Sequence, residues 1–283
     1  MVTLSAFADE VATDLADQVA ALRAVGIGHV DVRGVGGRNI STLDTAEVRG
    51  TRDTLDANEI GVASLASPIG KCPVDIPLAD LYGQVEQAAT YAHILGTPLV
   101  RVFSFYPTGA DDTAWRDGAL ERLGAMTSWA RDSGITLLVE NEKGTYAATV
   151  DGCAEICGAF GGDYLGTVLD AANYVQCGQA PYPDAYRALR PWIRHVHVKD
   201  VAADGAMVVA GKGRCRWPEL LEALRDDGYD GYLSLEPHLL HAGQFGGFTG
   251  PELFPGAVAA LRGLLAELAW TELPAVPLSE EMV

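Results

Sequence analysis

Short apolar runs alternate with longer amphipathic segments from the start of the chain to about residue 270. Eight of the short runs are rich in aliphatic and β-branched residues, which predicts strands at 4–8, 29–33, 62–66, 99–103, 136–140, 166–170, 193–198 and 232–236. Between them, apolar residues recur at spacings of three and four, as in DLADQVAALRAVG and ALERLGAMTSWARDSG, and this spacing predicts helices. Several helical segments end in glycine, as a left-handed helix cap requires: Gly26, Gly96, Gly134 and Gly228.

Eight strands, each followed by a helix over about 250 residues, are typical of a single (β/α)8 TIM barrel. An open, doubly wound sheet is the alternative, and it normally carries a glycine-rich phosphate loop after an early strand. The glycine-rich stretch RGVGGRN at 33–39 lacks the G-x-G-x-x-G spacing of such a loop. We therefore predict one barrel domain over residues 1–270 and an acidic, proline-containing tail over residues 271–283.

Composition narrows the classes of partner. The 20 basic and 38 acidic residues give a formal charge of −18, which disfavours nucleic acid and favours a small, neutral or locally neutralised substrate. The sequence contains no long apolar run and no basic segment followed by an apolar one near the start, so we expect neither a membrane span nor a signal peptide. The odd number of scattered cysteines does not indicate a disulfide framework, and we expect a cytoplasmic protein. The sequence does not decide between a monomer and a homo-oligomer.

Acidic residues stand at the ends of the later predicted strands. Glu140 ends the fifth strand, Asp170 the sixth and Glu236 the eighth, while RHVHVKD (194–200) ends the seventh with two histidines and a lysine. In a parallel barrel these ends meet on one face, where TIM-barrel chemistry collects. Any one such carboxylate is commonly a helix cap or an ion-pair partner, but several buried together need a cation. Three carboxylates and one imidazole suit Mn²⁺ best, with Mg²⁺, Co²⁺ or Zn²⁺ as alternatives.

Five segments carry a family resemblance: FADE near the start, VENEKGTY (139–146), LDAANY (169–174), HVHVKD (195–200) and GYDGYLSLEPH (228–238). On these the chain resembles the xylose isomerase-like TIM-barrel superfamily of sugar and sugar-phosphate isomerases and epimerases. The resemblance implies one divalent metal held by Glu140, Asp170, His197 and Glu236, with both glutamates also carrying protons. His195 is then either a packed core imidazole or a support for the metal ligands.

The implied reaction removes a proton beside a carbonyl and stabilises the resulting enediolate, as in a sugar isomerase or epimerase. Epimerase-like members tend to carry His, Glu and Arg at three positions where this chain has Asn173, Tyr146 and Ala203, respectively. The alternative is therefore a dehydratase or lyase acting on a keto-sugar, keto-inositol or dehydroshikimate-like substrate. A sugar-binding protein without catalysis is a third hypothesis.

Six further residues are predicted to bind the carbohydrate substrate: Asn173, Lys199, Glu142, Arg33, His238 and Arg214. For Lys199 the alternative is an ion pair with Asp200 or Glu142. Arg214 belongs to GKGR (211–214), which is either a flexible loop that holds a phosphate or carboxylate of the substrate, or an ordinary surface turn.

Overall fold

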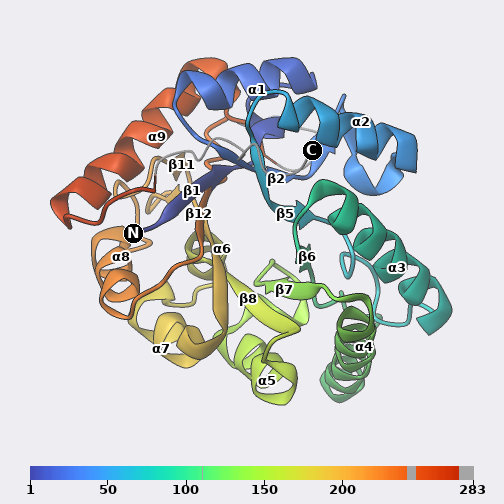
Figure 1. Ribbon diagram of the computed structural model, residues 1–283. Coiled ribbons are helices and arrows are strands. Elements are labelled where there is room, and N and C mark those ends of the chain that lie inside the picture. The colour runs from blue at the N-terminus through green and yellow to red at the C-terminus, as the bar shows by residue number, and fades with distance from the viewer. Residues whose placement is uncertain (110, 241–246, 274–283) are drawn as a thin grey trace. The chain divides into compact units, whose positions relative to one another are not determined.

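The computed structural model describes residues 1–109, 111–240 and 247–273 (Figure 1). Eight strands hydrogen-bond in the order β1-β12-β9-β8-β7-β6-β5-β2 and form a closed barrel. The order confirms the predicted (β/α)8 TIM barrel and excludes the open, doubly wound sheet. Their bounds are β1 Thr3–Ala6, β2 His29–Val32, β5 Gly61–Ala66, β6 Leu99–Val102, β7 Thr136–Glu140, β8 Leu165–Asp170, β9 Ile193–Val198 and β12 Tyr232–Leu235.

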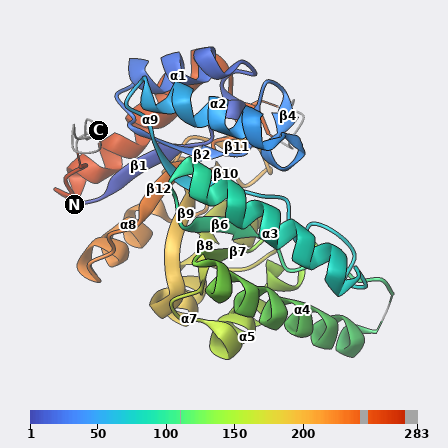
Figure 2. The ribbon, with the colours of Figure 1, turned by 45° about the vertical axis from the view of Figure 1, so that its right-hand side comes forward.

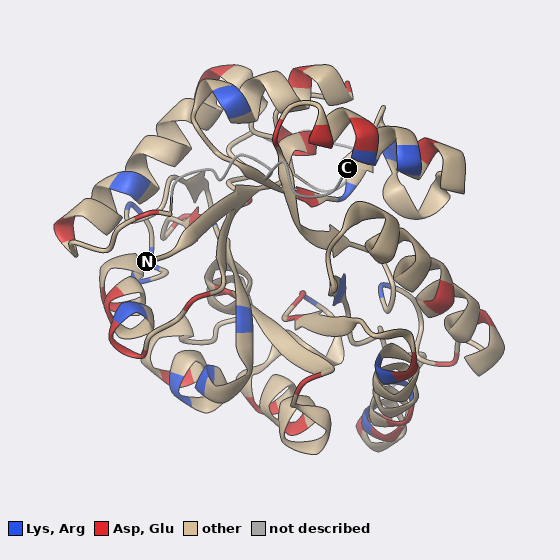
Figure 3. Cartoon of the chain, in the orientation of Figure 1, with Lys and Arg blue, Asp and Glu red and all other residues tan. Residues whose placement is uncertain are grey.

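Helices connect the strands and begin and end where their caps allow. Their bounds are α1 Leu15–Ala24, α2 Thr45–Asp56, α3 Leu78–Leu95, α4 Asp112–Ser133, α5 Val150–Phe160, α6 Ala171–Gln176, α7 Tyr186–Leu189, α8 Trp217–Asp226 and α9 Gly250–Glu267. The predicted glycine caps are present at α3 and α4, because Gly96 has φ +75° and Gly134 has φ +69°. Charged residues of both signs are spread along the helices, whereas the barrel strands are mostly uncharged (Figure 3).

The chain divides into two compact units, the first made of Met1–Ala63 and Val196–Val283. In this unit β1 pairs in parallel with β12, in a register that sets Ala6 opposite Leu235, and with β2. Two short hairpins follow barrel strands: β3 (Gly34–Val35) with β4 (Arg38–Asn39), and β10 (Asp200–Val201) with β11 (Met207–Val208). A turn of 3-10 helix, Ala8–Glu10, follows β1 directly.

The second unit, Ser64–His195, contains β6, β7 and β8 in parallel. Helices α3 and α4 pack side by side in it (Figure 2). Cys153 and Cys157 are buried on α5, as expected for small apolar side chains.

The predicted extent of the single domain, residues 1–270, stays a prediction. Most of the predicted tail, residues 274–283, lies outside the described residues. Within the described ranges, every helix is too short or too polar to cross a membrane.

Candidate functional site

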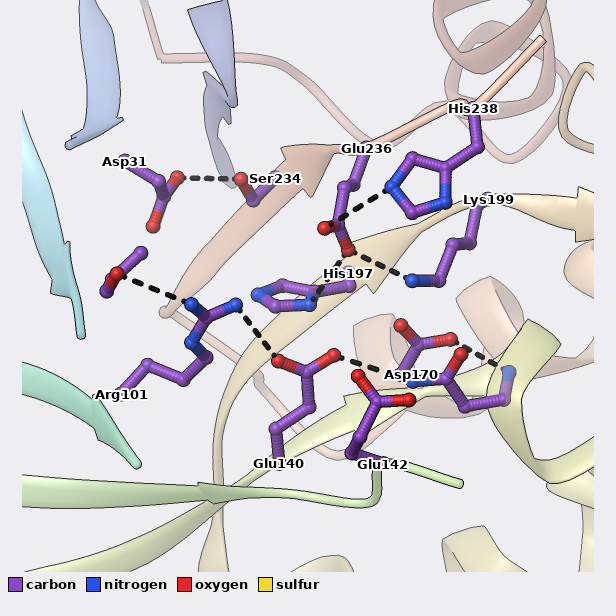
Figure 4. Close-up of polar contacts among 12 residues, drawn as sticks. Asp31, Arg101, Glu140, Glu142, Asp170, His197, Lys199, Ser234, Glu236 and His238 are labelled. Atoms are coloured by element: carbon purple, nitrogen blue, oxygen red, sulfur yellow. Dashed lines mark hydrogen bonds and ion pairs between the residues drawn. The ribbon is translucent and has the colours of Figure 1, made fainter. Parts of the chain in front are cut away.

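Glu236, the residue after β12, is a buried carboxylate of the first unit that contacts four basic side chains. Its side chain is 4% exposed, and Oε2 accepts a hydrogen bond from Lys199 Nζ at 2.9 Å and lies 3.2 Å from His197 Nδ1 (Figure 4). Oε1 lies 2.9 Å from Arg33 Nη1 and 3.3 Å from His238 Nε2. Burial raises the pKa of Glu236, but Lys199, His238 and His197 outweigh it and hold that pKa well below its ordinary value. Glu236 is therefore ionised at neutral pH.

Arg33 links Glu236 to the turn after β1. Its guanidinium donates two hydrogen bonds to Asp9, at 2.8 and 3.1 Å, and lies 4.7 Å from the centre of the Phe7 ring. Burial lowers the pKa of Arg33, but Asp9, Glu236 and Glu10 raise it by more than burial lowers it. The pKa of Arg33 therefore lies above its ordinary value, and Arg33 stays charged. Arg33 thus orients a predicted metal ligand, and its predicted contact with substrate stays a prediction.

Glu10, in the FADE segment, is a fully buried acid whose role was not predicted. Its Oε2 accepts hydrogen bonds from the backbone N–H of His238 and from Thr249 Oγ1, both at 3.0 Å, and its Oε1 lies 2.7 Å from His238 Nε2. His238 has φ +52°, a backbone conformation that costs a non-glycine residue about 1–3 kcal/mol. Glu10 therefore clamps both the backbone and the imidazole of His238 beside Glu236.

Glu10, Glu236 and His238 also offer ligand atoms within 4.8 Å of one another, so they form a possible metal-binding group by distance. Arg33, however, lies 2.9 Å from Glu236 and 3.6 Å from Glu10. The pKa of His238 is raised to about 9, so both ring nitrogens carry protons at neutral pH and the imidazole has no lone pair to offer a metal ion. We therefore infer that Glu10 and Glu236 orient His238 and do not bind a second metal ion with it.

We expect His238 to make the stability of the metal-free protein depend on pH. Burial and Lys199 lower the pKa of His238, but Glu236 and Glu10 outweigh them and raise it to about 9 from 6.5. A raised folded-state pKa stabilises the protein fully below pH 6.5, and that contribution is lost as the pH rises through about 9. The unfolding free energy should therefore fall by about 2–3 kcal/mol across this range.

Urea unfolding of chelator-treated wild type and His238→Gln at several pH values measures this effect. The decline should be much smaller in the variant. An equal decline in both proteins would rule out His238 as its source.

In the second unit, Glu140 ends β7 and is buried. Its Oε2 lies 3.1 Å from Arg101 Nη1, and its Oε1 accepts a hydrogen bond from Asn173 Nδ2 at 3.3 Å (Figure 4). Arg101 was not predicted, although a charged residue inside the apolar run LVRVF was a signal that could have identified it. Asn173 was predicted to bind substrate, and in the structure its side-chain amide fixes the orientation of Glu140.

Asp170 ends β8 and is fully buried. Its Oδ1 accepts the backbone N–H of Asn173 at 2.9 Å and so caps α6. The side chain of Asn141 also exchanges two hydrogen bonds of 2.9 Å with the Asp170 backbone. The sequence suggested that a strand-end carboxylate could cap the next helix, and one oxygen of Asp170 does so.

Lys199 and the residue after it, Asp200, have partners that the sequence did not indicate. Lys199 pairs with Glu236, whereas Asp200 accepts four backbone N–H groups, those of Val201, Gly211, Gly213 and Cys215, at 2.8–3.0 Å. Asp200 thus anchors the backbone of the GKGR loop, and the predicted contact of this loop with substrate stays a prediction. Gly211 and Gly213 direct their N–H groups at Asp200, and Arg214 is exposed.

Four side chains carry groups that a divalent metal ion takes as ligands: Glu140 and Asp170 in the second unit, and His197 and Glu236 in the first. All four side chains are buried. Glu142, also predicted at the site, forms an ion pair with Lys71. His195 is buried in β9.

Comparison with known proteins gives a family. The model of the family described as "Xylose isomerase-like TIM barrel" matches residues 19–262. An inosose dehydratase of Clostridium perfringens is 24% identical over 138 residues, which cover 41% of this chain and 44% of the relative. A D-psicose 3-epimerase of Enterocloster bolteae is 25% identical over 161 residues, which cover 54% of this chain and 51% of the relative. The chain thus spans about half the length of these curated relatives.

A solved structure shares the fold. A xylose isomerase-like TIM barrel protein from Mycobacterium smegmatis, in complex with magnesium, aligns with a TM-score of 0.68 at 20% identity and covers 89% of each chain.

Proposed function

Because the chain belongs to the xylose isomerase-like TIM barrel family, we propose that it is a divalent-metal-dependent isomerase or epimerase of a sugar or sugar derivative. The observation that carries this proposal is the set of four buried side chains, three carboxylates and one imidazole, that stand at strand ends: Glu140, Asp170, His197 and Glu236. Carboxylate oxygens and an imidazole nitrogen are ligands that divalent metal ions take in proteins. The relatives named as an epimerase and a dehydratase agree with an enzyme of sugars or cyclic polyols.

We propose that these four side chains hold one divalent cation, with Asp170 ligating through Oδ2 because Oδ1 caps α6. The donor set is mostly oxygen, which favours Mn²⁺ or Mg²⁺ over thiolate-seeking ions. The structural relative that contains magnesium supports a metal of this kind. When bound, such a cation polarises the substrate carbonyl and stabilises the negative charge of an enediolate.

Glu140 and Glu236 are the proposed proton carriers. Both are ordered by charge-assisted hydrogen bonds, Glu140 by Arg101 and Glu236 by Arg33 and Lys199. A carboxylate held in one orientation accepts a proton from a carbon acid without the cost of reorienting. The low pKa of Glu236 keeps it ionised, as both metal binding and proton acceptance require.

A dehydratase or lyase is the second candidate, and Asn173 favours it. Asn173 bonds Glu140 where epimerase-like members tend to carry histidine, and a neutral amide does not exchange protons at neutral pH. In the lyase the enediolate is not reprotonated. Its bond to the β-hydroxyl group breaks instead, and that group takes up a proton and leaves as water. The curated relative named inosose dehydratase agrees with a keto-inositol substrate for this reaction.

The remaining predicted substrate contacts stay proposals: Asn173, Lys199, Glu142, Arg33, His238 and Arg214. We also propose that the protein acts in the cytoplasm, because the five cysteines, all within the described residues, are not in disulfides, as is common in a reducing compartment.

Incubation of Mn²⁺-loaded enzyme with ketoses and keto-inositols in deuterated water tests the proposal. We expect one substrate to gain carbon-bound deuterium, because proton abstraction beside the carbonyl is common to both candidates. Deuterium gain without elimination, read by mass spectrometry and NMR, supports the isomerase, and loss of water supports the lyase. A protein that retains metal and exchanges no proton with any of these compounds would instead be a binding protein.

A further inference from the structure

Lys71, which was not predicted, lies against Glu142 at the carboxyl ends of β5 and β7. The Lys71 Nζ is 2.6 Å from Glu142 Oε2. The side chain of Lys71 is 38% exposed and that of Glu142 is 19% exposed, whereas Glu140, two residues earlier, is 2% exposed. The pair therefore lies where a ligand can reach it, next to a proposed metal ligand in the same unit.

The backbone of two loops holds this pair in place. Residues 69–74 run beside residues 103–106 through four backbone hydrogen bonds of 2.7–2.9 Å. Gly70 has φ +82°, and a Cβ at this position would lie 2.1 Å from the carbonyl oxygen of Phe103, so only glycine fits. Phe105 has φ +68° while fully buried, a conformation that costs about 1–3 kcal/mol. Lys71 is thus set by a strained, closely packed loop.

Glu142 is held equally closely. Its backbone N–H donates to the Glu140 carbonyl at 2.9 Å, its Oε1 accepts the N–H of Lys143 at 2.9 Å, and its carbonyl accepts from Thr145 Oγ1 at 2.8 Å. The tight turn that follows β7 therefore fixes the carboxylate of Glu142 relative to Glu140.

The buried ring of Phe103 contacts two cations. Lys71 Nζ lies 4.6 Å from the ring centre, and the Arg101 guanidinium also lies 4.6 Å from it. Arg101 is bound to Glu140 and Lys71 to Glu142. Two ion pairs are thus assembled on one aromatic ring, a buried one that includes the proposed metal ligand Glu140 and a partly exposed one.

We propose that Lys71 and Glu142 form a subsite that binds hydroxyl groups of a neutral polyol or sugar, next to the reacting carbon. An ammonium donates and a carboxylate accepts, so together they satisfy a hydroxyl group, which does both. Glu142 already neutralises Lys71, and a phosphate at this position would be repelled by the carboxylate. The subsite rests on the proposed function, and it deepens that function by naming an unphosphorylated substrate.

Binding of the unreactive polyols xylitol and myo-inositol to the Mn²⁺-loaded protein, measured by calorimetry, tests this subsite. At least one polyol should bind wild type, and Lys71→Met and Glu142→Gln should each weaken it about tenfold or more, since hydrogen bonds to charged groups contribute that much. The double variant should bind about as weakly as either single variant, because the two groups act as a unit. Inorganic phosphate should not compete with the polyol.

Glu272→Gln is the matched control, because Glu272 also forms a partly exposed ion pair, 2.7 Å from Arg262. Unchanged polyol affinity in Lys71→Met and Glu142→Gln would reduce the pair to a surface ion pair and overturn the subsite. Wild type that binds metal but neither polyol, or that is competed by phosphate, also overturns it. Absence of bound metal in wild type would instead refute the proposed function.

Discussion

Glu236→Gln is expected to remove metal binding and to lower kcat/KM by about 10³-fold or more, since the charge that stabilises the transition state goes with it. The substitution also leaves the buried Arg33 and Lys199 and the partly buried His238 without the carboxylate that pairs with all three. Removing one partner of a buried ion pair costs about 3–5 kcal/mol. The metal-free variant should therefore also unfold more easily than metal-free wild type.

Metal content by mass spectrometry, steady-state kinetics and denaturant unfolding together measure these effects. Glu272→Gln is again the control, because it removes a carboxylate charge from a partly exposed ion pair on the surface. It should keep the metal, the activity and the stability of wild type. Retention of stoichiometric metal by Glu236→Gln would show that the cation does not depend on this carboxylate and would end the four-ligand proposal.

Asp200→Ala is expected to lower the unfolding free energy by about 2–5 kcal/mol, because four backbone N–H groups lose their acceptor. Oδ1 accepts from Val201 and Cys215, and Oδ2 accepts from Gly211 and Gly213. A side chain at Gly213 would meet Asp200 Oδ1 at 2.2 Å, so the loop is packed directly on the carboxylate. Amide exchange over residues 211–215 should rise in parallel.

Asp200→Asn separates charge from shape in the same experiment. Its single carbonyl oxygen can keep two of the four hydrogen bonds, so about half of the stability loss is expected. A loss of under about 1 kcal/mol in Asp200→Ala, with amide exchange unchanged, would show that water replaces the carboxylate at little cost.

The barrel could be predicted because the patterns that indicate each strand and helix lie within that element. Runs such as TLLVE and IRHVHV are rich in aliphatic and β-branched residues, and both strands have the predicted bounds, Thr136–Glu140 and Ile193–Val198. The polar residues that end such runs were equally visible, so Glu140, Asp170, His197 and Glu236 could be named without a structure. Periodicity and helix caps depend on neighbours a few residues apart, which a sequence displays directly.

The partners of these residues could not be predicted in the same way. For Lys199 the sequence left open a substrate contact or an ion pair with Asp200 or Glu142, and the structure shows a pair with Glu236, 37 residues away, while Asp200 accepts backbone N–H groups of a loop. The amide of Asn173 was assigned to the substrate, and it also orients Glu140.

Sequence alone therefore determined the strand–helix order and the kinds of side chain at the strand ends. The closing of the barrel decided which charges meet. β1 pairs with β12, so the turn after the first strand brings Glu10 to His238, 228 residues away, and β2 adjoins β1, which brings Arg33 to Glu236, 203 residues away. Such contacts depend on strand register and sheet closure, which no local pattern encodes.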